Sequence, residues 1–181
     1  MKKAVILIIL SLFVFSFKIW AKDYKIGPED VIEVGVWKEP DLSRTVIVRP
    51  DGKISLPLIG DVQAKGLTPI QLKDEIQRKF KSFLSNPVVF VILTEINSPK
   101  IYILGKVKSP GMYPLKSDLT LLQAIALAGG FAEWAKKDKV IILRREKEKD
   151  IRLIVNIDKL VKNKGGEKDV ELKNGDRVII P

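Results

Sequence analysis

Acidic side chains gather at turn signals early in the chain, where a pair of carboxylates could hydrolyse a glycan as general acid and base. The candidates are Glu29, Asp30, Glu39, Asp41 and Asp51. Each lies within two residues of a proline or a glycine, and acidic residues are common there because they hydrogen-bond the turning backbone. The chain has neither a phosphate-binding loop motif nor a dinucleotide-binding motif. These acids therefore fit turns better than a catalytic site.

Cysteine and histidine are both absent from the sequence. Without cysteine the chain has no disulfide, thiolate metal site, cysteine nucleophile or cysteine for lipid attachment. Without histidine it lacks the side chain most often used as a general base and as a metal ligand. We therefore expect no catalytic residue, no bound metal and no cofactor.

Aromatic and basic side chains offer a different chemistry, because flat rings suit the apolar faces of sugars. The aromatic candidates are Trp37, Tyr113 and Trp134. Packing in a core or an interface is their alternative role. Lys106, Lys108 and Lys116 flank Tyr113 and could attract acidic sugars, although exposed lysines are ordinary solvated surface. The resulting hypothesis is a ligand-binding surface formed by Lys106, Lys108 and Tyr113.

The first 21 residues have the pattern of a secretory signal peptide. Lys2 and Lys3 provide a positive start, residues 4–17 carry no charge, and Ala21 is small enough for signal-peptidase cleavage. The uncharged run is short for a bilayer span, which needs about 20 apolar residues. We expect residues 1–21 to be cleaved on export to the periplasm. An uncleaved inner-membrane anchor is the alternative.

The charge of the exported chain is strongly positive. The formal net charge of +10 falls to +7 when the signal and its three lysines are removed. A basic surface favours nucleic acid, anionic lipid or an acidic polymer as partners. Export makes nucleic acid the poorest of these candidates, so we expect no nucleic-acid binding.

Two consecutive segments share a plan of short strands around one main helix, which predicts an α+β fold with two small domains. Asn97-Ser98-Pro99 is polar and ends in proline, so it marks the expected boundary between residues 22–98 and 99–181. A single continuous domain over 22–181 is the alternative. Domains of this size bury only about 60% of their unfolded surface. Association with copies or partners would therefore add burial.

Turn and cap motifs organise the first half. Asp51-Gly52 between valine- and isoleucine-rich runs predicts a tight hairpin whose flanking strands pair. Thr68-Pro69-Ile70-Gln71 predicts a capped helix beginning at Pro69. Residues 88–94 are uniformly apolar up to the final threonine and predict a strand buried on both faces. The apolar stripe expected on the helix comprises Leu72, Ile76, Phe80, Phe83 and Leu84.

Glycine and proline punctuate the start of the second half. Gly105 permits a bulge or a close backbone approach, and Pro110-Gly111 predicts a turn with positive φ at the glycine. Asp118 or Thr120 caps the next helix, which ends at Gly129-Gly130 in the left-handed conformation. The stretch GKVKSPGMYPL is thus mainly a device for shaping the backbone.

The remainder of the chain alternates charged turns with apolar runs. Residues 144–150, RREKEKD, predict a solvated loop between two strands. A short helix over 157–161, a flexible segment at Lys164–Gly166 and a turn at Asn174–Asp176 are expected to precede a final strand over 177–180.

The long, ordered motifs resemble a known family. YKIGPEDVIEVGVW and RPDGKISLPLIGDVQAKGLTPIQL are similar to the polysaccharide export domain of capsule and exopolysaccharide exporters. GKVKSPGMYPL, TLLQAIALAGGF and LKNGDRVIIP resemble one soluble-ligand-binding β-grasp (SLBB) domain. Matching positions in the first domain are Gly27, Asp30, Pro50, Asp51, Gly52, Pro57, Gly60 and Gly66. Those in the second are Gly105, Pro110, Gly111, Ala128, Gly129, Gly130, Gly175 and Asp176.

The resemblance implies a non-enzymatic component of a periplasm-spanning export machine whose members form rings around the passing polymer. Its implied partners are copies of the chain, the exported polysaccharide and an inner-membrane polysaccharide co-polymerase. Many members add a lipidated cysteine, further SLBB repeats and a C-terminal amphipathic helix that enters the outer membrane. The motifs of this sequence include none of these. We therefore expect a ring or adaptor that works with a separate outer-membrane channel. The alternatives are a monomeric periplasmic carbohydrate-binding module and an envelope hydrolase.

Overall fold

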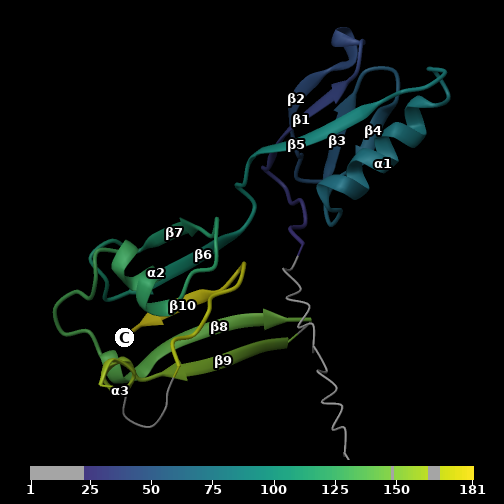
Figure 1. Ribbon diagram of the computed structural model, residues 1–181. Helices are drawn as coiled ribbons and strands as arrows, with labels where there is room; N and C mark the ends of the chain where they lie inside the picture. Colours follow the sequence, from purple (N-terminus) through teal and green to yellow (C-terminus); the bar gives the residue numbers. More distant parts are fainter. Residues whose placement is uncertain (1–22, 148, 163–167) are drawn as a thin grey trace, which may run out of the picture.

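The computed structural model describes residues 23–147, 149–162 and 168–181. The predicted signal peptide and the predicted flexible segment Lys164–Gly166 lie outside the described residues. The described chain forms two lobes joined by a short linker (Figure 1). Each lobe has its own cluster of buried apolar residues. The fold is therefore α+β with two domains, as the sequence predicts.

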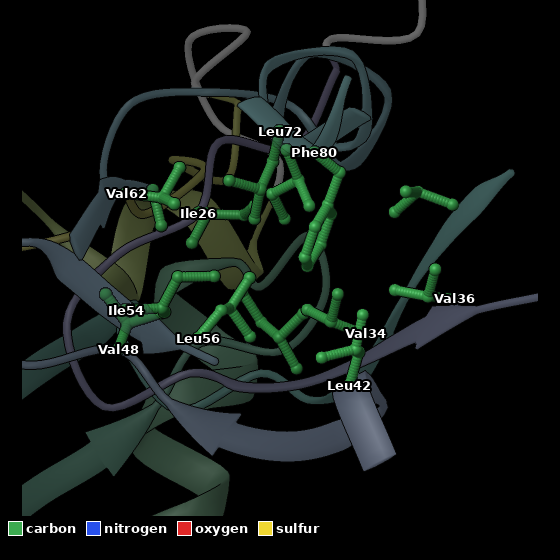
Figure 2. Packing of buried hydrophobic residues seen from close by; sticks show 14 residues of the cluster. Ile26, Val34, Val36, Leu42, Val48, Ile54, Leu56, Val62, Leu72 and Phe80 are labelled. Atoms are coloured by element: carbon green, nitrogen blue, oxygen red, sulfur yellow. The ribbon is translucent and has the colours of Figure 1, made fainter. Parts of the chain in front are cut away.

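The first domain packs two small antiparallel sheets with one main helix (Figure 1). Its elements are β1 (Val31–Val36), η1 (Pro40–Leu42), β2 (Arg44–Ile47), β3 (Lys53–Leu56), β4 (Gly60–Gln63), α1 (Pro69–Phe80) and β5 (Val89–Glu95). The larger sheet has the strand order β2-β1-β5, and β3 pairs with β4 separately. Leu72 and Phe80 of α1 point into the core toward Leu56 of β3 (Figure 2).

The capped start of α1 is confirmed. The Thr68 hydroxyl accepts a hydrogen bond from the Gln71 backbone N–H, and the Gln71 side chain accepts one from the Thr68 N–H. Leu72, Ile76 and Phe80 are fully buried, so the apolar stripe fixes the helix on the core. Leu84 is half-buried against the same core. Phe83 is 56% exposed, because the chain has left the helix by that residue.

Two strand predictions for the first domain are wrong. The Asp51-Gly52 turn exists, but β2 pairs with β1 and β3 pairs with β4 instead of with each other. The Gly52 carbonyl accepts hydrogen bonds from Ala64 and Lys65, which draws the turn toward β4. β5 is buried on one face only, since no helix of the described chain covers the side of the sheet opposite α1.

The second domain is built on a five-stranded sheet with the order β7-β6-β10-β8-β9 (Figure 1). Its elements are β6 (Lys100–Gly105), β7 (Gly111–Pro114), α2 (Leu121–Leu127), η2 (Lys137–Lys139), β8 (Val140–Glu146), β9 (Lys149–Val155), α3 (Ile157–Val161) and β10 (Arg177–Ile180). β10 runs parallel to β6 and antiparallel to β8, so the end of the chain lies in the middle of the sheet. Within the described residues, no helix has the length and apolar character needed to cross a bilayer.

Several predictions for the second domain are confirmed. Thr120 caps α2 with a capping box, Gly129 and Gly130 follow the helix with φ of 80° and 85°, and α3 and β10 have the expected bounds. Gly111 does not have positive φ, because it already pairs with Ile103 as the first residue of β7.

The charged stretch 144–150 is also different from the prediction. β8 extends to Glu146 and β9 begins at Lys149, so most of RREKEKD belongs to a long antiparallel pair. Arg144 lies on the inner face of the sheet and is buried. Its burial is possible because its guanidinium donates hydrogen bonds to the buried Asp176 carboxylate.

Candidate functional site

Asp30 joins the first domain to the linker. Its side chain is fully buried, and its Oδ1 accepts hydrogen bonds from the backbone N–H groups of Asn97 (2.9 Å) and Ser98 (2.8 Å). Its Oδ2 accepts from the Gly27 N–H (2.8 Å) and the Tyr24 hydroxyl (2.5 Å). A buried carboxylate is tolerable when donors satisfy it in this way. Burial and the bond to Asp30 raise the pKa of Tyr24 above its ordinary range.

The approach of the linker to the first domain requires a glycine. A Cβ atom on Gly27 would lie 2.4 Å from the Ser98 Oγ, which leaves no room for a side chain. On the far side of the linker, the Lys100 N–H donates to the Asn174 side chain, and the Lys100 ammonium pairs with Glu29. The linker is therefore hydrogen-bonded to both domains.

Asp176 plays the corresponding part in the second domain. It is fully buried and accepts hydrogen bonds from Arg144 Nε (3.0 Å), Arg144 Nη2 (2.7 Å) and the Lys173 N–H (2.8 Å). The bonds to Asp176 raise the pKa of Arg144, against the opposing effect of burial. Sequence reasoning missed Arg144, although its place two residues after Ile142 in an alternating run would have put it on the buried face.

Arg49 ties the Asp51-Gly52 turn to the β3–β4 hairpin. Its guanidinium donates to both oxygens of Asp51 and both oxygens of Asp61, and it also reaches the Ser55 hydroxyl. The hydrogen bond from Arg49, followed by that from Ser55, lowers the pKa of Asp61 to about 2. The cluster is exposed, so it orders a surface turn and is not a cleft.

The acids considered for catalysis are thus mostly engaged in structural contacts. Glu29 pairs with Lys100, Asp30 holds the linker and Asp51 pairs with Arg49. Two oppositely tuned carboxylates facing one cleft would be expected of a glycosidase. Asp51 and Asp61 share Arg49, whose hydrogen bonds lower the pKa of both carboxyl groups, so this pair is not oppositely tuned.

The stretch GKVKSPGMYPL shapes the backbone at Gly105. This residue has φ of 88°, and a Cβ atom there would lie 2.0 Å from the Ile180 carbonyl oxygen. The same carbonyl accepts a hydrogen bond from the Lys106 N–H. Gly105 therefore lets the chain turn away while it stays against the central strand β10.

Of the predicted ligand-binding residues, Lys106 and Lys108 are exposed and Tyr113 is half-buried. Tyr113 lies on the inner face of the sheet, packs on the core and donates its hydroxyl to the Ser109 carbonyl. The Lys106 ammonium reaches the Trp134 carbonyl, and Lys108 is exposed beside Gly129. Ligand binding by Lys106, Lys108 and Tyr113 stays a prediction.

The remaining motif positions are turn residues for the most part. The Pro57 carbonyl accepts a hydrogen bond from the Ile59 N–H in the tight turn that leads to β4. Gly60, Gly66 and Gly175 have φ of 63°, 85° and 86°. Left-handed backbone is unfavourable for residues with a Cβ atom, so these positions favour glycine for conformational reasons.

The larger sheet of the first domain has an uncovered apolar face. The strand registers place Ile47 beside Val31, and Phe90 beside Gly35. The Phe90 ring covers Gly35, since a Cβ atom on that glycine would lie 1.8 Å from the ring. We call this surface the first outer face; it comprises Val31, Ile47, Phe90 and Ile92.

The sheet of the second domain also has an uncovered apolar face. Four aliphatic residues lie in one row across four strands, because the registers pair Leu104 with Ile179, Ile179 with Ile141 and Ile141 with Ile154. Their chain neighbours Ile103, Ile142, Val178 and Ile180 point to the opposite side and are buried. We call the row the second outer face; it comprises Leu104, Ile141, Ile154 and Ile179.

The described part of the chain includes a groove in the first domain and another beside the linker. One, of about 560 Å³, lies beside the linker and is lined by residues of both domains, including Lys25, Lys116 and Arg145. The other, of about 530 Å³, lies at the end of the first domain between Trp37 and Phe83. Trp134 lines neither groove and is 86% exposed.

The two domains correspond to two known family models. Residues 20–94 match the family described as polysaccharide biosynthesis/export protein, and residues 100–154 match the SLBB domain. An export-type domain followed by an SLBB domain is the organisation that the sequence motifs indicate. The chain belongs to the polysaccharide export protein family.

Individual relatives agree with this assignment. The chain is 30% identical to the polysialic acid transport protein KpsD of Escherichia coli over 160 residues, which cover 87% of this chain and 28% of KpsD. It is 31% identical to the exopolysaccharide production protein ExoF of Rhizobium meliloti over 123 residues, covering 61% of this chain and 29% of ExoF.

A third relative is an outer-membrane protein by name. The chain is 28% identical to the EPS I polysaccharide export outer membrane protein EpsA of Ralstonia solanacearum over 134 residues, covering 61% of this chain and 36% of EpsA. The chain therefore spans between about a quarter and just over a third of the length of these relatives.

Proposed function

We propose that this chain is a non-enzymatic periplasmic component of a polysaccharide export machine and that its copies assemble into a ring or adaptor for the polymer. The polysaccharide is suggested by the similar proteins, which are named for polysaccharide transport, production or export. An inner-membrane co-polymerase supplies the polymer, and a separate outer-membrane channel receives it. We also propose that the boundary between the two domains lies near residue 98.

The two outer faces are the main observation that supports assembly of several copies. Each exposes large aliphatic side chains, with Ile47 and Ile154 both 63% exposed. Monomeric soluble proteins rarely leave such patches uncovered. Covering them would also supply the burial that two small domains lack.

Charge favours contact between different faces of neighbouring copies. Glu33 lies on the first outer face between Thr45 and Ile92, whereas Arg152 and Arg177 lie beside the aliphatic row of the second. Arg177 is paired with Asp150, so Arg152 provides the positive charge. Opposite charges at the edges of apolar patches select the partner and the orientation. A contact between two different patches repeats from copy to copy and closes into a ring when the rotation allows.

Light scattering of the purified protein across a concentration series tests the assembly. We expect a defined species well above a dimer, and we expect Ile47→Asp and Ile154→Asp each to reduce it to monomers. Mixing these two variants should give a dimer, because each retains the face that the other lacks. Ile70→Asp is the matched control, since Ile70 is 70% exposed on α1 and belongs to neither face.

Deletion of the gene tests the export role. We expect loss of surface polysaccharide with accumulation inside the envelope, restored by the native gene and not by the Ile47→Asp gene. A persistent monomer with saturable affinity for oligosaccharides would favour a monomeric carbohydrate-binding module. Turnover of a glycan by the purified protein would contradict the non-enzymatic role.

A further inference from the structure

The groove between Trp37 and Phe83 lies at the end of the first domain opposite the linker. β1 ends at Val36 and the antiparallel β5 begins at Val89, so the groove is formed where these strands meet. The other end of β5 leads into the linker (Figure 1). The groove is therefore separate from the contacts that hold the two domains.

A tight turn presents Trp37 to solvent. The Trp37 N–H donates to the Val88 carbonyl, and the Glu39 N–H donates back to the Val36 carbonyl. Lys38 has φ of 65° in this turn, at a position where glycine or asparagine is usual. The side chain of Trp37 remains 65% exposed. The backbone thus holds the indole ring at the surface.

Phe83 provides the facing wall. The N–H groups of Phe83 and Leu84 both donate to the Phe80 carbonyl, which extends the end of α1 in a tight turn. Phe80 is fully buried and anchors this turn, whereas Phe83 points outward and is 56% exposed. Two aromatic side chains from different segments therefore border the same groove.

The rest of the lining combines apolar residues with polar ones whose charges sum to zero. Ser85 and Asn86 come from the loop before β5, and Lys38 and Glu39 come from the turn after β1. Within the described residues, the side chains of Lys38, Glu39 and Asn86 make no ion pair or side-chain hydrogen bond. The groove volume of about 530 Å³ is in the range of small-ligand sites.

We propose that this groove binds an uncharged sugar unit of a polysaccharide, with Trp37 stacking on the sugar ring. A pyranose has apolar C–H faces and hydroxyl edges, which match aromatic walls beside amide, carboxylate and ammonium groups. Lys38 and Glu39 cancel in charge, so the lining offers no net attraction to an anionic sugar or membrane. The identity of the polymer as the exported one rests on the proposed function.

Tryptophan fluorescence tests the site with one reporter. Trp20 belongs to the predicted signal peptide, so Trp134→Phe leaves Trp37 as the one tryptophan of residues 22–181. The probe is a set of oligosaccharides released by partial hydrolysis from the exported polymer of the producing cells and separated into neutral and acidic fractions. We expect the neutral fraction to shift the Trp37 emission saturably, and the acidic fraction to do so at least tenfold more weakly.

Matched variants separate stacking from general exposure. By calorimetry, Trp37→Ala should weaken binding at least tenfold and Asn86→Ala about fivefold, whereas Trp134→Ala should leave it unchanged. Unchanged binding in folded Trp37→Ala, or no binding of any fraction, overturns the proposal. So does a Trp37 shift caused only by phospholipid vesicles or by increasing protein concentration, because these indicate a membrane or a second copy as the occupant.

The assembly state distinguishes this inference from the proposed function. Trp37→Ala should assemble as the native protein does in light scattering. Native protein that assembles and exports but binds no sugar would overturn this inference alone. Native protein that binds sugar but stays monomeric would contradict only the ring.

Discussion

Asp30 of the first domain accepts two hydrogen bonds from Ser98 of the linker, one from the backbone N–H at 2.8 Å and one from the hydroxyl at 3.3 Å. These residues are 68 positions apart in the chain. The buried carboxylate thus fixes the point where the chain leaves the first domain. Asp176 has a similar role in the turn before β10, where it accepts a hydrogen bond from the Lys173 N–H. Each domain thus has a buried aspartate that satisfies backbone donors.

Asp30→Asn should destabilise the first domain by about 2 to 3 kcal/mol. The amide oxygen can still accept from Asn97 and Ser98, but the amide NH₂ would face the Gly27 N–H, where Oδ2 now accepts. Urea unfolding measures the change. Asp41→Asn is the control, since Asp41 is exposed and should cost little. Equal stability of both variants would contradict the role of Asp30.

Arg144→Leu should cost roughly 3 to 5 kcal/mol of unfolding free energy, because Asp176 would keep its charge in the core without its strongest partner. The comparison is Arg177→Leu, whose ion pair with Asp150 is exposed and should be worth less than about 1 kcal/mol. Denaturant unfolding of the two variants measures the difference. Similar losses would mean that burial of the Arg144–Asp176 pair contributes nothing.

Gly105→Ala should destabilise the second domain by about 3 kcal/mol or more, because φ of 88° is strained for alanine and the new methyl group would overlap the Ile180 carbonyl. Gly111→Ala is the matched control in the same stretch. Gly111 has no positive φ, and a Cβ atom there meets no atom within 4 Å. Thermal unfolding should separate the two variants clearly, and a tolerant Gly105→Ala would refute the close approach of the strands.

The Arg49 cluster should make stability depend on acid pH. The pKa of Asp61 is lowered from its ordinary value of 3.8 to about 2 in the folded chain. A lowered pKa means that the carboxylate stabilises the fold above the ordinary pKa and that this stabilisation is lost as pH falls toward 2.

Urea midpoints measured from pH 5 to pH 2 test this dependence. They should fall less steeply in Arg49→Gln than in the native protein, since the hydrogen bonds from Arg49 are the main cause of the lowered pKa. Arg44→Gln is the control for a general change of charge, because Arg44 is exposed on β2 and makes no ion pair within the described residues. Parallel pH curves for native protein and Arg49→Gln would contradict the assignment.

Local patterns predicted much of the fold because their physics is local. The Thr68 and Thr120 capping boxes, the Gly129-Gly130 helix end and the last strand each depend on a few adjacent residues. Predictions that required knowledge of distant neighbours were less successful. The Asp51-Gly52 turn formed, but the partners of its flanking strands were set by β1 and β4.

The candidate site followed the same division. The sequence identified Trp37 as a residue that could stack on a sugar, but it assigned Phe83 to the core. Because α1 ends at Phe80, the Phe83 side chain points outward and lines the same groove as Trp37. Likewise, Lys106, Lys108 and Tyr113 are close in the chain, yet strand alternation directs Tyr113 to the buried side of the sheet.

By itself, the sequence determined the family, the two α+β units and the turns, because ordered motifs of glycine, proline and aspartate encode backbone conformations that need no distant partner. The tertiary structure decided which apolar residues stay exposed. Burial depends on what covers each sheet face, and among the described residues no helix lies on the outer side of either sheet to cover Ile47 or Ile154.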